Sequence, residues 1–153
     1  MELEVFSFSK HRKVLIEKSI GFYIKILNLK EFDFMIYVVP KQGLRKKFGT
    51  LGSISKISDD ELVIYIDNKL SLPRLLTTLA HEMVHAKQIM SGEFHTVKSR
   101  NGKFKRFWFG KQISTRYEKQ PWEIEAYTME KQLVHALLDH AHRNKKRKAK
   151  CKK

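Results

Sequence analysis

Two histidines and a glutamate form the pattern H-E-x-x-H at His81, Glu82 and His85. On an α-helix, residues four apart lie on one face, one turn from each other, so both imidazoles can bind a single Zn²⁺. Glu82 follows the first histidine and points beside the metal rather than at it. Its carboxylate can then take a proton from a water that the metal activates, as a general base does. The pattern predicts a zinc-dependent hydrolytic site.

The segment around this motif, Leu72–Met90, has the pattern of an amphipathic helix. Ser71 is a suitable N-cap and Pro73 suits a first helical turn. Apolar residues recur at three- and four-residue steps, which predicts one buried stripe. They are Leu75, Leu76, Leu79, Met83, Ala86 and Met90. We expect the two motif histidines at the edge of the core, facing a cleft.

A catalytic zinc site needs a third protein ligand. A second long helix predicted over residues 121–144 offers Glu123 and Glu125, and His95 is a further candidate. At about 100° per residue, Glu123 falls roughly 50° from the centre of the apolar stripe of this helix, and Glu125 roughly 110°. We therefore favour Glu123 and keep Glu125 as the alternative. Glu130 shares the face of Glu123 and could orient a zinc histidine as an outer-shell acceptor.

The remaining sequence predicts one α+β domain over residues 1–142, which must position these side chains. An amphipathic helix is expected first, followed by two buried strands with a twisted or bulged strand, or two short strands, between them. These segments are residues 10–28, 34–39, 62–67 and 45–57. We expect a short, mostly antiparallel twisted sheet, then the motif helix, a hairpin and the second long helix.

The segment 91–114 alternates aromatic residues with lysines and arginines, and its glycines suggest one or two hairpins. Aromatic rings beside positive charges can stack bases and bind phosphates. The alternative, which we favour, is that these rings pack over the motif helix, as aromatics in hairpins usually pack. A third possibility is a latent enzyme whose cleft the hairpin covers until a substrate or partner moves it.

The chain is strongly basic, with 31 Lys and Arg against 16 Asp and Glu, a net charge of +15. Residues 143–153 form a separate basic tail without a single acid, which we expect to be disordered. Such a tail can contact nucleic-acid phosphates without sequence specificity, or it can serve solubility or localisation. The candidate contact residues are Arg143, Lys145, Lys146, Arg147 and Lys148.

Cysteine content and hydropathy indicate the cellular compartment in which we expect the protein. Cys151, in the tail, is the single cysteine, so neither a disulfide framework nor a cysteine-based zinc site is expected. No apolar run approaches the ~20 residues of a membrane span, and the N-terminus lacks a signal-peptide layout. We expect an intracellular, cytoplasmic protein without a membrane partner. It lacks a long apolar heptad pattern and is expected to be a monomer.

Two stretches resemble known peptidase families. The motif, together with Pro121-Trp122-Glu123-Ile124-Glu125-Ala126, is similar to small zincin metallopeptidases, in particular to minimal gluzincins. In gluzincins a second helix often carries E-x-x-A-D; Glu123 and Ala126 match, but Tyr127 stands at the Asp position. Residues 79–86 also resemble SprT-like proteases, which act on DNA-associated proteins and use a third histidine. His95 comes early for that role and lacks a neighbouring glycine.

The resemblance covers roughly residues 33–138 and extends to small proteins of these kinds encoded by phages and other viruses. It implies a zincin fold and hydrolysis of peptide bonds in a protein or peptide substrate, with Glu123 completing the zinc site. A further group must stabilise the oxyanion, and Tyr117, Tyr127 and His95 are candidates. The alternative is a non-catalytic, basic nucleic-acid-binding protein with a vestigial or structural zinc site. Structural zinc sites have four ligands and usually include cysteine.

Overall fold

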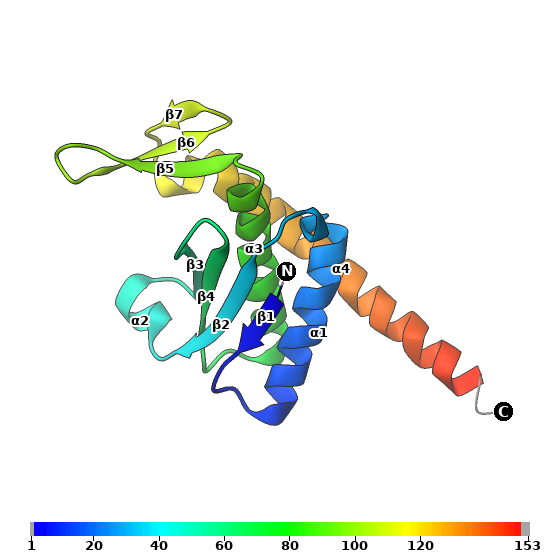
Figure 1. The fold of residues 1–153 in the computed structure, drawn as a ribbon. Coiled ribbons are helices and arrows are strands. Elements are labelled where there is room, and N and C mark those ends of the chain that lie inside the picture. Colours follow the sequence, from blue (N-terminus) through cyan, green and yellow to red (C-terminus); the bar gives the residue numbers. More distant parts are fainter. Residues whose placement is uncertain (1, 151–153) are drawn as a thin grey trace.

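The structure is a computed structural model that describes residues 2–150, except for the side chains of residues 118 and 148–150. The chain contains both helices and strands, and the strands form two sheets (Figure 1). The elements are β1 (Glu2–Val5), α1 (Lys10–Ile26), β2 (Met35–Lys41), α2 (Leu44–Phe48), β3 (Gly52–Lys56), β4 (Glu61–Asp67), α3 (Leu72–Met90), β5 (Phe94–Lys98), β6 (Phe104–Trp108), β7 (Lys111–Ile113) and α4 (Pro121–Lys150), with 3₁₀ turns at Leu29–Glu31 and Tyr117–Lys119. The α+β class predicted from the sequence is confirmed.

The larger sheet has the strand order β1-β2-β4-β3, in which only β3 and β4 pair antiparallel. Our prediction of a mostly antiparallel sheet was wrong. The short strand β1 was missed, and its connection to β2 through helix α1 makes that pair parallel. After β2 the chain forms the edge strand β3 and then turns back as β4, which lies between β2 and β3. Strand β4 therefore also runs parallel to β2.

Helices α1 and α3 pack against each other and against this sheet, and α4 packs along α3 (Figure 1). The bounds predicted for α3 and its buried stripe are confirmed. The core contains fully buried side chains from α1, from the strands of the larger sheet and from α3. They include Ile16, Ile20 and Tyr23 of α1, Ile36, Leu62, Ile64 and Ile66 of the strands, and Leu75, Leu79 and Met83 of α3. This core holds the motif helix rigidly against the sheet.

The segment predicted as a strand over residues 45–57 begins with the short helix α2 instead. Gly43 and Gly49, which flank α2, both have left-handed backbone angles, with φ of 73° and 72°. Such angles suit glycine and stop an extended strand from continuing through them. Only the second half of the segment, from Gly52, joins the sheet, as its edge strand β3.

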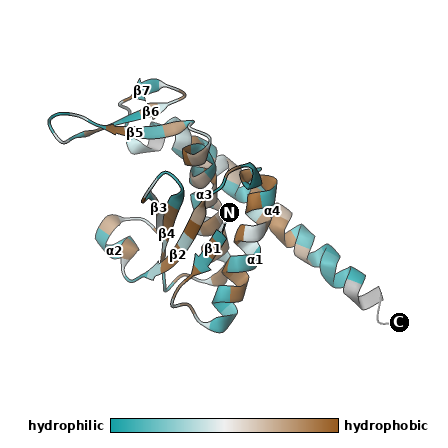
Figure 2. Ribbon diagram, viewed as in Figure 1, coloured by the Kyte–Doolittle hydropathy of each residue, from teal (hydrophilic) through white to brown (hydrophobic). Residues whose placement is uncertain are grey.

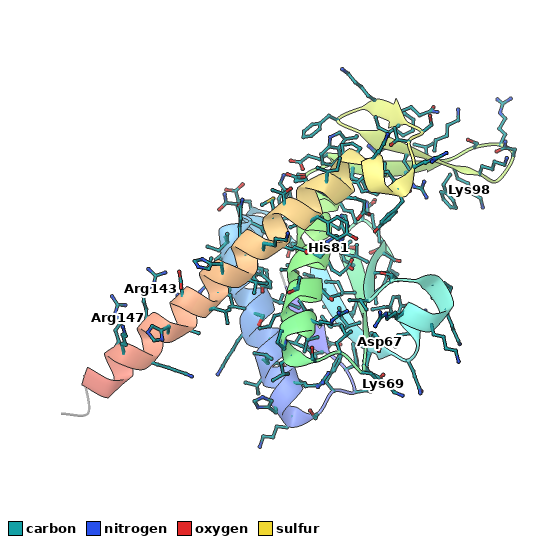
Figure 3. All side chains as sticks on the ribbon, turned by 180° about the vertical axis from the view of Figure 1, so that it is seen from behind. Asp67, Lys69, His81, Lys98, Arg143 and Arg147 are labelled. Carbon is teal, nitrogen blue, oxygen red and sulfur yellow. The ribbon has the colours of Figure 1, made fainter. Side chains whose placement is uncertain are left out.

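Helix α4 continues through the segment that we expected to be a disordered tail. Lysine, arginine and alanine are good helix formers, so the packed first half of α4 can propagate to Lys150. Its last turns project from the domain and are hydrophilic (Figure 2), and Arg143 and Arg147 lie on this projecting end (Figure 3). The side chains of Arg143, Lys145, Lys146 and Arg147 are exposed, whereas that of Lys148 lies outside the described residues. Nucleic-acid binding by this end stays a prediction.

The segment 91–114 forms a second, antiparallel sheet of order β5-β6-β7, beside the start of α4 (Figure 1). Phe94 and Trp108 pack near Trp122 of α4, with ring centroids 4.7 Å and 6.3 Å from that of Trp122. These rings pack as we expected of hairpin aromatics, but their ring partner lies on α4 and not on the motif helix α3. Phe104 and Phe109, in contrast, are 65% and 64% exposed. Among the described residues, no helix is both long and apolar enough to cross a membrane.

Candidate metal centre

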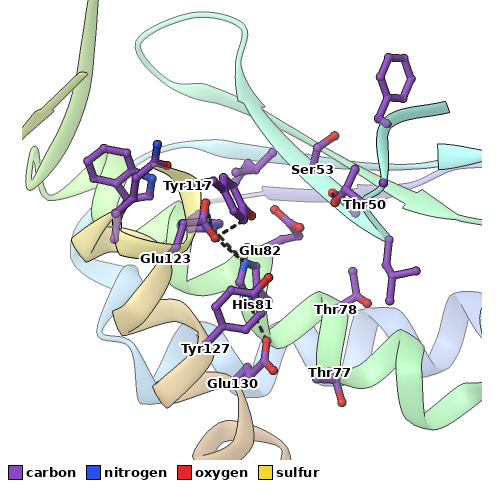
Figure 4. A pocket seen from close by; sticks show the side chains of 18 of the residues that line it. Thr50, Ser53, Thr77, Thr78, His81, Glu82, Tyr117, Glu123, Tyr127 and Glu130 are labelled. Carbon is purple, nitrogen blue, oxygen red and sulfur yellow. Dashed lines mark hydrogen bonds and ion pairs between the residues drawn. The ribbon is translucent and has the colours of Figure 1, made fainter. Parts of the chain in front are cut away.

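Helices α3 and α4 bring the two motif histidines and one glutamate to a common point. The Nε2 atoms of His81 and His85 lie 3.1 Å apart. Glu123, in the first turn of α4, places its carboxylate oxygens 3.4 Å from Nε2 of His81 and 3.6 Å from Nε2 of His85. The side chains are largely removed from solvent and meet in a cleft between α3, α4 and β3 (Figure 4). This cluster could hold a metal ion.

The spacing of these atoms fits a tetrahedral zinc site. With metal–ligand bonds of about 2.0–2.1 Å, two neighbouring ligand atoms of a tetrahedral site lie about 3.3 Å apart. The two Nε2 atoms are 3.1 Å apart, and each lies 3.4 Å or 3.6 Å from one of the two carboxylate oxygens of Glu123, which is close to this value. Two imidazoles and one carboxylate are also a donor set used by catalytic zinc sites. The residues therefore fit the ion that the sequence motif predicts.

Hydrogen bonds on the far side of each imidazole direct both Nε2 lone pairs toward the same point. His81 donates from Nδ1 to Oε2 of Glu130 over 2.9 Å, as predicted for that glutamate. His85 donates from Nδ1 to Oε1 of Gln88 over 2.7 Å. With both Nδ1 atoms protonated, the facing Nε2 atoms need a positive charge between them, which is a proton on His81 in the metal-free protein or a bound metal ion. This arrangement favours a metal ion at that point.

Gln88 was not identified from the sequence, and it explains the position of Glu125. The side chain of Gln88 is fully buried, and its Nε2 donates to the carbonyl of Trp122 and to Oε2 of Glu125, over 3.0 Å and 2.8 Å. The carboxylate of Glu125 also lies 3.6 Å from Nζ of Lys87. The structure thus brings Glu123, and not Glu125, to the histidines. A buried amide three residues after a motif histidine is the signal that could have identified Gln88.

Contacts between carboxylates and imidazoles strongly shift the pKa values of the site residues when no metal is bound. Burial disfavours the charged form of His81, but the hydrogen bonds to Glu123 and Glu130 outweigh it and raise its pKa to about 9. Burial also disfavours the charged form of Glu123, but the hydrogen bonds to His81 and His85 lower its pKa to about 2. A metal ion that binds here therefore displaces a proton from an imidazolium and meets a ready carboxylate.

Glu82 lies beside the cluster with its carboxyl group almost fully buried (Figure 4). Burial raises its pKa to about 7, although the nearby His85 and His81 act in the opposite direction. A carboxyl group with a pKa near 7 can both accept and release a proton at neutral pH, as a general base must. Strand β3 passes so closely that a Cβ on Gly52 would lie 2.9 Å from Oε1 of Glu82. Gly52 was also missed, although a glycine inside a strand often marks such a close approach.

Two of the three candidates for oxyanion stabilisation lie at the cluster. Tyr117 donates its hydroxyl hydrogen to Oε2 of Glu123 over 2.8 Å, and the ring of Tyr127 lies 4.7 Å from the ring of His81. Both side chains line the cleft (Figure 4). His95 instead stacks on Phe107 and does not line the cleft. Tyr117 and Tyr127 therefore remain as candidates for this role, whereas His95 lies outside the cleft.

Comparison with protein-family models, curated proteins and solved structures finds no match for this chain. Its chemistry is therefore inferred from its own side chains. Three converging ligand atoms, a buried carboxyl group beside them and phenol hydroxyls in the same cleft can bind a divalent metal, move a proton and stabilise a developing negative charge. These are the elements of metal-assisted hydrolysis.

Proposed function

We propose that this protein is a zinc-dependent metallopeptidase of the zincin type, in which His81, His85 and Glu123 bind Zn²⁺. The convergence of their ligand atoms at the spacing of a tetrahedral site carries this proposal. The order of helix, strands, motif helix, small sheet and second helix also supports a zincin-like arrangement. Because these three residues lie beside a cleft, water or a substrate could reach a zinc ion that they would hold.

The side chains of the cleft divide the hydrolytic work among them. Zinc supplies Lewis-acid chemistry when bound, since it acidifies water and polarises a carbonyl. Glu82 accepts the proton of the attacking water and then delivers it to the nitrogen of the leaving amine. Tyr117 and Tyr127 place hydroxyl groups where negative charge develops on the carbonyl oxygen. Glu130 and Gln88 hold the histidines in the required tautomer.

The non-catalytic alternative receives less support. A structural zinc site needs four ligands, and the cluster offers three among the described residues, beside a cleft that a substrate can enter. The exposed basic end of α4 supports an addition to the proposal, namely that the enzyme acts on proteins held near nucleic acid. The same exposure also fits a solubilising role.

Zinc content separates the two candidate ligands and tests the proposal at its base. Wild-type protein, Glu123→Ala and Glu125→Ala are purified side by side, loaded with zinc and dialysed, and their zinc content is measured by atomic emission. We expect one zinc per chain in the wild type and in Glu125→Ala, and a loss of zinc in Glu123→Ala, since Glu123 and not Glu125 lies at the Nε2 atoms of the histidines. If the wild-type protein retains no zinc, the proposed function is wrong.

Glu82→Gln tests the catalytic step separately from metal binding. The amide is similar in size to the carboxylate but cannot act as a base, so we expect full zinc content and a loss of peptide cleavage of at least a hundredfold. Cleavage of a denatured protein substrate, followed by mass spectrometry, is the assay. A Glu82→Gln variant that cuts as fast as the wild type contradicts this mechanism.

A further inference from the structure

The cleft that contains the metal cluster is a long groove beside helix α3. Its lining includes residues of α3 from Pro73, in the first turn, to Ile89, near the end. At ~1.5 Å per residue these positions are about 24 Å apart, which corresponds to roughly seven residues of an extended polypeptide. His81 lies midway along this stretch, with Thr77 and Thr78 on one side of it (Figure 4). A polypeptide bound in the groove therefore extends to both sides of the metal cluster.

The two ends of this groove carry arginines, whereas its centre carries the carboxylates. Arg74 lies at the start of α3, and Arg106 lies on β6, which pairs with the strand that follows the end of α3. At the centre, Glu123 and Glu130 both contact His81. No ion pair joins Arg74 or Arg106 to an acid whose side chain the structure describes. Among the described side chains, the positive charge at both ends is therefore not paired with an acid.

The position of Arg74 favours an anionic ligand for a second reason. It lies in the first turn of α3, where the helix dipole favours negative charge, and that turn contains no acid. At this end the carboxylate of Asp67 lines the adjoining hollow together with Arg74. Asp67 is occupied, because it accepts hydrogen bonds from the backbone N–H groups of Lys69 and Arg45, over 3.0 Å and 3.5 Å. An incoming carboxylate would meet an exposed guanidinium that forms no ion pair with the acids that the structure describes.

The packing of the small sheet places Arg106 at the other end of the groove. Arg106 and Trp108 lie two residues apart on β6 and therefore share a face of the sheet. Trp108 packs near Trp122 at the start of α4 and so directs this face toward the cleft. Phe94, the partner of Trp108 across the sheet, lines the groove beside Arg106. Arg106 is exposed and can reach a ligand in the groove.

We propose, on the basis of the peptidase function above, that the groove selects polypeptides with acidic side chains on both sides of the cleaved bond. One carboxylate would pair with Arg74 and the other with Arg106, since a guanidinium binds a carboxylate through two parallel hydrogen bonds. Arg74 lies about three residues of extended chain from the metal cluster, judged from the offset of seven positions between Arg74 and His81 on α3, and Ile89, at the end of the groove near Arg106, has a similar offset of eight. Acidic residues at that distance before and after the bond are favoured.

The test uses quenched fluorescent peptides that are identical except for glutamate or glutamine about three residues before or after the cleaved bond. The bond itself is located by mass spectrometry. We expect the wild type to cleave each glutamate peptide about three- to tenfold more efficiently than its glutamine twin, and added salt to reduce this preference. Arg74→Gln should remove the preference on one side of the bond and Arg106→Gln on the other. Arg100→Gln, the same change in the exposed turn between β5 and β6, outside the groove lining, should leave both unchanged.

Binding to the zinc-loaded Glu82→Gln variant separates this inference from the peptidase proposal. If no peptide is ever cleaved, but glutamate peptides bind this variant more tightly and lose the advantage with Arg106→Gln, the charge selection stands and the catalytic function fails. If the wild type cleaves glutamate and glutamine peptides equally, the charge selection is overturned and the catalytic function stands. Absence of any peptide preference, together with single-stranded oligonucleotide binding that both arginine substitutions weaken, would overturn it in favour of nucleic acid.

Discussion

Strand β3 passes close to the carboxyl group of Glu82 at Gly52, and the substitution Gly52→Ala probes this close approach. A Cβ at this position would lie 2.6 Å from Cγ2 of Thr78, 2.9 Å from Oε1 of Glu82 and 3.2 Å from the carbonyl oxygen of Tyr65. Ordinary contact begins at 3.4 Å, so the Thr78 methyl group must retreat by 0.8 Å and the Glu82 oxygen by 0.5 Å. Both side chains are buried in a packed region, which leaves them little freedom to move.

The expected magnitude follows from these displacements. A catalytic group misplaced by 1 Å can cost about a hundredfold in rate, so a shift of half that size predicts a loss of about tenfold in kcat. Overpacking beside Thr78 should lower the free energy of unfolding by about 1–3 kcal/mol. Zinc content should stay at the wild-type level, because the metal ligands are not displaced. Peptide cleavage, zinc content and thermal unfolding followed by circular dichroism measure the three effects.

Two further variants decide which conflict causes the loss of activity. The double variant Gly52→Ala, Thr78→Ser removes the methyl conflict but keeps the conflict with Glu82, so stability should recover while kcat stays low. Gly21→Ala is the matched control, because Gly21 lies in helix α1 with nothing within 4 Å of the added Cβ. It should leave activity unchanged and raise the free energy of unfolding by about 0.5–1 kcal/mol. Full activity in the double variant would refute the role assigned to the close approach at Glu82.

Three further predictions concern the groups around the metal cluster. Glu130→Gln weakens the charged acceptor behind His81, so zinc affinity should fall about ten- to a hundredfold in a chelator competition assay; unchanged affinity contradicts the orienting role. Since the pKa of metal-free His81 is about 9, zinc must displace its proton at lower pH, and the apparent affinity should rise about tenfold per pH unit up to that value. Calorimetry at ~pH 7 in buffers of different ionisation enthalpy should show at least one released proton, and none would count against the Glu123 and Glu130 contacts. Tyr117→Phe should lower kcat about tenfold to a hundredfold with zinc content retained, and an unchanged kcat would leave Tyr127 as the oxyanion donor.

The sequence by itself determined the local parts of the site. A four-residue spacing on a regular helix places His81 and His85 together whatever surrounds them, and the apolar stripe predicted the bounds of α3. Helical phase also favoured Glu123 over Glu125 on the second helix, and the structure brings Glu123 to the histidines. These features depend on a periodicity that each helix carries within its own residues.

Only the tertiary structure decided the features that join distant segments. The parallel pairing of β1 with β2 depends on a crossover that no local pattern encodes, and the left-handed glycines around α2 act through backbone angles that residue types only suggest. The contact between Gly52 and Glu82 and the two arginines at the ends of the groove likewise arise between elements. Hydrophobic periodicity reports which face of an element is buried, but not which other element covers it. The residues that could hold a metal ion were therefore predictable from the sequence, whereas the shape and charge of the groove around them required the fold.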